Sequence, residues 1–388
     1  MRSTHPPLFL TALLTALLLA CAQPELRSQR ASDAGREPTE HRTALATGIE
    51  MRWIELGAPQ GEPVLFLHGL TDTSRSFLGT MQALTDLRPE LRLIAPDLRG
   101  HGGTSLPAGA GCPADPGSCF APSLLAADAL ALLDHLHVKR AHVVGHSLGS
   151  LVGQELALVH PERVERLVLI GSSARFGDCP PLQALVVEGL VEGPWKEAVL
   201  ARGLAFPRDA WALEPRALPG AEAFLAENWV AEPGTDPALL AAILTETVRV
   251  PLGTWIGVPR ALQSSDNRAR LAALRAPTLV LAAVQDGLFP VEPVQRELCE
   301  ALAGAHARHG TPWAWKRYGR ALPADNGAPT DLGHNFHWAV PGAVARDLAA
   351  FLRPGGAPTE EESFLDPSGA RVVHRPHGAR VLGSPGTN

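Results

Sequence analysis

One serine in the chain has the neighbours expected of a catalytic nucleophile. It is Ser147, in the sequence Gly-His-Ser-Leu-Gly at residues 145–149. This motif requires a strand before it and a helix after it, and the hydrophobic pattern predicts a buried strand at 141–145 and a helix at 148–160. Such a turn would raise the hydroxyl above the sheet edge, beside a helix N-terminus whose dipole and free N–H groups favour negative charge. The residues therefore predict nucleophilic attack on an acyl group.

Three segments stand in an order that matches one known family. Residues 66–70, Phe-Leu-His-Gly-Leu, resemble its oxyanion loop, residues 97–105 resemble its D-x-R-G-x-G-x-S loop, and residues 141–164 resemble its nucleophile region. On these motifs the chain resembles the α/β-hydrolase fold family over about 50–172 and 268–352. The resemblance implies an α/β fold, a doubly wound and mostly parallel sheet with an inserted helical cap. It says little about the substrate, because this fold hosts many reactions.

The resemblance also implies an acid and a base that follow Ser147 in that order. Residues 280–290 resemble the strand and loop that carry the acid, which makes Asp286 the candidate. Residues 332–338 resemble the base motif, a Gly-His pair before the last helix, which makes His334 the base. A serine nucleophile needs such a base, and the base needs a group to orient it.

Two alternatives stay open. Asp178 lies soon after an earlier strand, where some members of the family carry the acid, and His337 could serve as the base instead of His334. The separation of Asp286 and His334 is 48 positions (334 − 286), longer than expected, because a Gly/Pro-rich loop at 319–333 precedes the histidine.

The oxyanion hole implied by the resemblance uses the backbone N–H groups of Leu148 and Leu70. His68, His101 and His146 belong to the loop motifs and are interpreted as structural residues. No cofactor is expected for this chemistry. No metal is expected either, because the paired histidines of the chain have no acidic or Cys partner at a suitable spacing.

The strands and helices that position these residues alternate along the chain. Apolar runs typical of buried parallel strands occur at 64–67, 92–97, 141–145, 164–170, 277–283 and 313–318. Helical patterns lie between them, which indicates right-handed crossovers. The expected organisation is a signal peptide at 1–20, a tether at 21–45, core halves at 46–173 and 269–353, a helical cap at 174–268 and a loosely ordered tail at 354–388.

The predicted cap contains Trp195, Trp211, Trp229 and Trp255 among many Leu and Ala residues. Its composition suggests a small apolar acyl or aromatic ester as substrate. The alternative is that these aromatic residues pack the core of the cap itself.

The N-terminus predicts export. An apolar run at 8–20 is too short to span a bilayer comfortably and fits a signal peptide. Leu18-Leu19-Ala20-Cys21 resembles a bacterial lipobox, so Cys21 is the expected site of lipid attachment and membrane anchoring. The sequence at 20–22 also has the A-x-A form of an ordinary signal-peptidase site, which would give a secreted protein.

Composition limits the other possibilities. The chain has 388 residues, a formal net charge of −6 and no run of Lys or Arg, so nucleic acid is not an expected partner. Cys112 and Cys119 enclose a Pro/Gly-rich loop and could form a disulfide in an oxidising compartment, or could remain free thiols.

The sequence thus predicts a serine hydrolase that cleaves a carboxylic ester through an acyl-enzyme on Ser147, with His334 as base and Asp286 as orienting acid. Lactonase, thioesterase, perhydrolase and C–C hydrolase activities are alternatives on the same fold. A non-catalytic, surface-anchored binding module is the alternative from another class of protein.

Overall fold

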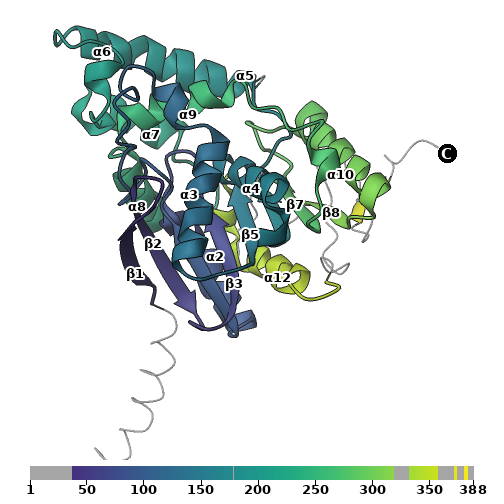
Figure 1. The fold of residues 1–388 in the computed structure, drawn as a ribbon. Coiled ribbons are helices and arrows are strands. Elements are labelled where there is room, and N and C mark those ends of the chain that lie inside the picture. Colours follow the sequence, from purple (N-terminus) through teal and green to yellow (C-terminus); the bar gives the residue numbers. More distant parts are fainter. Residues whose placement is uncertain (1–36, 178, 319–331, 357–370, 374–379, 383–388) are drawn as a thin grey trace, which may run out of the picture.

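An eight-stranded sheet forms the centre of the computed structural model, which describes residues 37–177, 179–318, 332–356, 371–373 and 380–382 (Figure 1). The strand order is β1-β2-β4-β3-β5-β6-β7-β8. The strands are β1 (Thr39–Ala44), β2 (Glu50–Gly57), β3 (Glu62–Leu67), β4 (Leu91–Pro96), β5 (Ala141–His146), β6 (Val164–Ile170), β7 (Thr278–Ala283) and β8 (Trp313–Tyr318). β2 pairs antiparallel with β1 and β4, and the other pairs are parallel.

Helices cover both faces of the sheet, as the doubly wound prediction requires. They are α2 (Leu78–Leu87), α3 (Pro122–His135), α4 (Leu148–Val159), α10 (Arg296–His309), α11 (Phe336–Ala339) and α12 (Pro341–Phe351). Apolar residues of α3, α4 and α10 form one core with one face of the sheet, and those of α2 and α12 form a second core on the other face. Every residue of β5 and β7 is buried, which explains why their sequences are apolar without alternation. The predicted fold class is confirmed.

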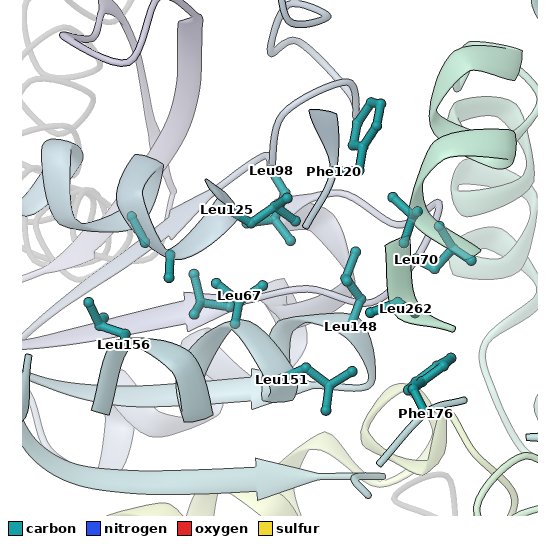
Figure 2. Packing of buried hydrophobic residues seen from close by; sticks show 14 of the residues in the cluster. Leu67, Leu70, Leu98, Phe120, Leu125, Leu148, Leu151, Leu156, Phe176 and Leu262 are labelled. Carbon is teal, nitrogen blue, oxygen red and sulfur yellow. The ribbon is translucent and has the colours of Figure 1, made fainter. Parts of the chain in front are cut away.

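The packing around the start of α4 positions the serine turn. Figure 2 shows Leu67, the last residue of β3, in the same cluster as Leu148 and Leu151 of α4. All three side chains are at most 1% exposed. The N-terminus of α4 is therefore held against the ends of the central strands by apolar burial.

The segment between β6 and β7 is mainly helical and lies beyond one end of the sheet (Figure 1). It comprises α5 (Pro180–Leu182), a kinked helix (Gln183–Trp195), α6 (Lys196–Leu200), α7 (Ala221–Asn228), α8 (Pro237–Thr247) and α9 (Leu252–Leu262), with short 3₁₀ turns. These residues correspond to the predicted cap.

Most of the aromatic residues of the cap pack its own core. Trp195 and Trp255 are buried and meet edge to face, with ring centroids 5.1 Å apart. Trp211 packs against α9 of the cap, where a Cβ on Gly253 would lie 2.4 Å from its ring, and it also contacts Phe120 outside the cap, at 6.0 Å between centroids. Trp229 lies 5.6 Å from Trp255 and also lines the cavity described below. The alternative interpretation therefore holds for three of the four tryptophans.

Two boundaries differ from the sequence prediction. The sequence places residues 39–44 in the tether, but in the structure they form β1, which pairs with β2 over its whole length. Within the predicted tail, Arg371–Val373 and Arg380–Leu382 form an antiparallel pair of short strands, β9 and β10. The predicted signal peptide, Cys21 and Asp178 lie outside the described residues.

A disulfide joins Cys112 and Cys119, whose Cα atoms are 5.7 Å apart. This selects the disulfide over the pair of free thiols. The bridge closes the Pro/Gly-rich loop before α3, and Phe120, directly after it, is completely buried. The loop is thereby tied to the core.

We expect the double substitution Cys112→Ser/Cys119→Ser to lower the free energy of unfolding by about 2 kcal/mol, because the bridge restricts a short loop in the unfolded chain. Urea denaturation with and without reductant measures this. The native protein should lose stability in reductant and the variant should not. Equal stability of all four samples would contradict the bridge.

Candidate active site

Ser147 occupies a strained turn between β5 and α4. Its φ angle is +50°, a left-handed conformation that is uncommon for residues other than glycine. The two glycines of the motif are required by space. A Cβ on Gly145 would lie 2.3 Å from the carbonyl oxygen of Gly149, and a Cβ on Gly149 would lie 2.0 Å from that of Leu67. The turn thus presents the hydroxyl of Ser147 at the end of the central strands.

Asp286 and His334 form a direct pair. The Nδ1 atom of His334 lies 3.0 and 2.9 Å from the two carboxylate oxygens of Asp286. The carboxylate is buried, and one of its oxygens accepts hydrogen bonds from the backbone N–H groups of Leu288 and Phe289, at 2.9 and 2.8 Å. These donors orient the acid, and the acid orients the imidazole.

The pKa of His334 is raised above its usual value. Burial acts to lower this pKa, but the charge of Asp286 and its hydrogen bond to Nδ1 outweigh burial. Glu232 and Asp72 raise the pKa further. The imidazolium is therefore stabilised by three carboxyl groups. Among the residues that the structure describes, Nε2 of His334 has no hydrogen-bond partner, so this nitrogen is free to take a proton.

His146, inside the serine motif, holds the backbone of His334. Its Nε2 lies 3.1 Å from the carbonyl oxygen of His334. Burial, together with the charges of His337 and His334, lowers the pKa of His146 well below its usual value, so the ring is neutral. A carbonyl oxygen only accepts, so the single ring proton is on Nε2. The structural role predicted for His146 thus includes a contact with the candidate base.

Glu232, from the cap, contacts the same backbone from another direction. Its two carboxylate oxygens accept hydrogen bonds from the N–H groups of Gly333, at 2.7 Å, and Asn335, at 3.0 Å. Burial raises the pKa of Glu232 to about 7, against the effect of these two hydrogen bonds. His334 lies between the two donor residues.

Asp72 lies beside His146, with one carboxylate oxygen 3.8 Å from Nδ1 of that ring. Burial raises the pKa of Asp72 to about 7, although His334 acts to lower it. Sequence analysis missed both Asp72 and Glu232. Neither belongs to a motif with a catalytic meaning, and only the folded chain brings them to His334.

The proposed oxyanion donors lie at the expected ends of elements. Leu148 is the first residue of α4, where a backbone N–H has no partner within the helix. Leu70 follows β3 and lines the cavity that Ser147 also lines. The next residue, Thr71, has a φ angle of +66° and accepts a hydrogen bond from Nε1 of Trp229 at 2.7 Å. A cap residue therefore contacts the loop that contains the predicted oxyanion donor Leu70.

Two buried residues tie the loops at the ends of β3 and β4 together. Nε2 of His68 accepts a hydrogen bond from the N–H of Leu98 at 2.8 Å. Asp97 accepts from the N–H groups of Ser74 and Gly103, each at 2.8 Å. These contacts give His68 and Asp97, one from each loop motif, a structural role at the site.

A cavity of about 310 Å³ lies between this edge of the sheet and the cap. Most of its lining is apolar. The lining residues are Gly69, Leu70, Asp72, His146, Ser147, Phe176, Cys179, Pro181, Leu182, Leu185, Asn228, Trp229, Val230, Ala231, Gly287, Leu288, Phe289, His334, Asn335 and Trp338. Ser147 and His334 thus line the same cavity.

The rival base lies elsewhere. His337 is buried beside Phe77 and His146, and both of its ring nitrogens are without a hydrogen bond to any described residue. Burial, with a contribution from His334, lowers its pKa to about 3. Asp286 contacts His334, not His337. Over the described ranges, no cluster of three or more His, Cys, Asp or Glu side chains could hold a metal ion.

Comparisons with known proteins agree with this architecture. Residues 62–309 match the model of the alpha/beta hydrolase fold family. The chain is 33% identical to the dihydrolipoyllysine-residue acetyltransferase component of the acetoin cleaving system of Pseudomonas putida, over 39% of this chain and only 37% of that protein. It is 32% identical to a protein of Variovorax paradoxus assigned as a carbamate hydrolase, over 62% of this chain and 80% of that protein.

Solved structures agree on the fold. A hydrolase from Pseudomonas aeruginosa superimposes with a TM-score of 0.58 and 24% identity, over 81% of this chain and 99% of that structure. The family match extends over more than half of the 388 residues and includes β3 to β7, the serine turn and Asp286. The chain belongs to the α/β-hydrolase fold family.

Proposed function

We propose that the protein is a serine hydrolase that cleaves a carboxylic ester through an acyl-enzyme on Ser147. The observation that carries the proposal is the hydrogen-bonded His334–Asp286 pair, whose histidine lines the same cavity as Ser147. A nucleophile, a base and a group that orients the base are the minimum set for this chemistry.

Each group has a role that its contacts support. Nε2 of His334 takes the proton of the Ser147 hydroxyl as the oxygen attacks the acyl carbon. Nδ1 keeps its proton in the hydrogen bond to Asp286, which stabilises the imidazolium. The imidazolium then protonates the leaving alcohol. A water molecule, deprotonated by the same nitrogen, releases the acid and restores the serine.

The N–H groups of Leu70 and Leu148 would stabilise the tetrahedral oxyanion, a contribution of about 3 kcal/mol for each donor. No cofactor takes part in this scheme. The apolar lining of the cavity, with Phe176, Leu182 and Leu185, favours a small ester with an apolar acyl or aromatic group. Lactones, thioesters and carbamates offer the same electrophilic carbonyl, so a panel of these substrates separates the related activities.

Ser147→Ala should reduce ester hydrolysis by at least about 10⁴-fold and abolish labelling by a fluorophosphonate, because the attacking oxygen is removed while little packing is lost. Hydrolysis of p-nitrophenyl butyrate and gel detection of the label measure this. Ser264→Ala, an exposed serine of the cap, is the matched control and should label normally. Persistent labelling of Ser147→Ala would overturn the assignment of the nucleophile.

Activity should fall as the pH drops through the pKa of His334, because only the neutral imidazole can accept the serine proton. Since this pKa is raised, the midpoint of kcat/KM should lie above about 6.5, the usual histidine value. Asp286→Asn should lower both the rate and the midpoint, because it removes the main charge that supports the imidazolium. A flat profile between pH 5 and 8 would argue against a histidine base.

We also propose that the protein is exported and held at a membrane by a lipid on Cys21. The Cys112–Cys119 disulfide supports export, because disulfides persist in oxidising compartments. Cys21→Ser should release the protein from the membrane fraction into the soluble exported fraction. Mass spectrometry of a mature N-terminus at Gln23 would instead indicate plain secretion.

A further inference from the structure

One short segment of the cap contacts both catalytic loops. Trp229 donates its Nε1–H to the hydroxyl of Thr71 in the oxyanion loop, at 2.7 Å. Three residues later, Glu232 accepts hydrogen bonds from the N–H groups of Gly333 and Asn335 in the base loop. Trp229 and the two intervening residues, Val230 and Ala231, line the cavity that Ser147 also lines.

The contacts of Glu232 are aimed at the backbone on either side of His334. One oxygen accepts a hydrogen bond from the N–H of Gly333, before the histidine, and the other accepts one from the N–H of Asn335, after it. His146 holds the carbonyl oxygen of His334 itself. Asp286 contacts Nδ1 of the ring. Four hydrogen bonds from more distant parts of the chain also hold the backbone of the base loop, in addition to its local hydrogen bonds.

The fourth of these backbone hydrogen bonds joins the N–H of Gln285, next to the acid, to the carbonyl oxygen of Leu332, at 3.3 Å. The other three come from Glu232 and His146. Glu232 alone supplies two of the four, and it is the only one of these partners that comes from the cap. Losing its carboxylate would therefore free the base loop on the side that faces the cap.

Glu232 is a buried carboxyl group, and burying its charged form costs desolvation free energy. The side chain is 4% exposed, and within the described residues the charges that act on its pKa are those of His334 and Asp286, not of a Lys or Arg. A buried carboxylate without a cation is expensive to retain. Gly333 gives the carboxylate room, because a Cβ at that position would lie 3.0 Å from Oε2 of Glu232.

We propose that Glu232 is a positioning residue for His334, through which the cap holds the base in line with Ser147. The inference rests on the proposed function, since it assigns the base to His334. The proposed role of Glu232 is electrostatic and geometric and involves no covalent step. The carboxylate fixes the two peptide groups around the base, and its charge supports the imidazolium that forms during acyl transfer.

The raised pKa of Glu232, about 7, adds a consequence. When the carboxyl group gains a proton, one of its oxygens becomes a donor and no longer suits a backbone N–H. The two hydrogen bonds that hold the base loop should then weaken as the pH falls through the pKa of Glu232. Asp286 and Asp72 are the other carboxyl groups that act on His334, and His146 and His337 are the neighbouring rings.

Two substitutions separate geometry from charge. Glu232→Gln keeps the shape but offers an N–H₂ group where one backbone N–H needs an acceptor, and it removes the charge. Glu232→Asp keeps the charge but is too short to reach both donors. Glu227→Gln, on the exposed side of α7, makes the same chemical change elsewhere in the cap and is the matched control.

For Glu232→Gln we expect kcat/KM for p-nitrophenyl butyrate to fall by about 10- to 100-fold, because small displacements of a catalytic group are costly. The acid-limb midpoint of the pH profile should move to lower pH. Glu232→Asp should lose rate but keep its midpoint closer to that of the native enzyme. Glu227→Gln should match the native enzyme in both measurements.

Circular dichroism and thermal unfolding of each variant accompany the kinetics. If Glu232→Gln does not fold, the comparison of Glu232→Asp with the native enzyme decides, and an unchanged rate in that variant overturns the proposal. A folded Glu232→Gln with native rate, or with a reduced rate and an unmoved midpoint, overturns it as well. Failure of the proposed function can be distinguished from failure of the Glu232 proposal by His334→Ala. If His334 is not the base, that variant retains full activity, independent of the result for the Glu232 variants.

Discussion

The hydrogen bond between Asp286 and Nδ1 of His334 is the interaction on which the rest of the site depends. In the neutral imidazole it places the ring proton on Nδ1 and leaves Nε2 unprotonated, and Nε2 has no hydrogen-bond partner among the described residues. It joins the loop after β7 to the loop before α11, which are separated by a whole strand and helix in sequence. The apolar burial of β7 holds one partner, whereas the other is held by contacts with its backbone.

Several carboxyl groups around one imidazole create a balance of opposing effects. Burial disfavours the imidazolium, and the charges of Asp286, Glu232 and Asp72 favour it. The same burial raises the pKa of Glu232 and of Asp72 to about 7. The pKa of the candidate base is therefore raised by carboxyl groups that are themselves buried, one on the cap and one on the loop after β3.

The sequence predicted those features that depend on local constraints. The turn at Ser147 requires two glycines, because the surrounding backbone leaves no room for a side chain at either position. The central strands are apolar because helices cover both faces of the sheet. β1 was missed because its residues are polar and mostly exposed, so no hydrophobic pattern distinguishes it from a tether. Its pairing with β2 supplies the structure that its own sequence does not indicate.

Glu232 and Asp72 could not be predicted in the same way, because their importance comes only from contacts over long separations in the chain. Glu232 lies 101 positions before Gly333, in a cap segment whose sequence carries no catalytic motif. Nothing local distinguishes it from the exposed glutamates of α7 nearby. What distinguishes it is the direction of its side chain, away from solvent and toward the two peptide groups around the base. The cap is consequently more than a cover for the cavity, since one of its segments contacts both loops between which the substrate would lie.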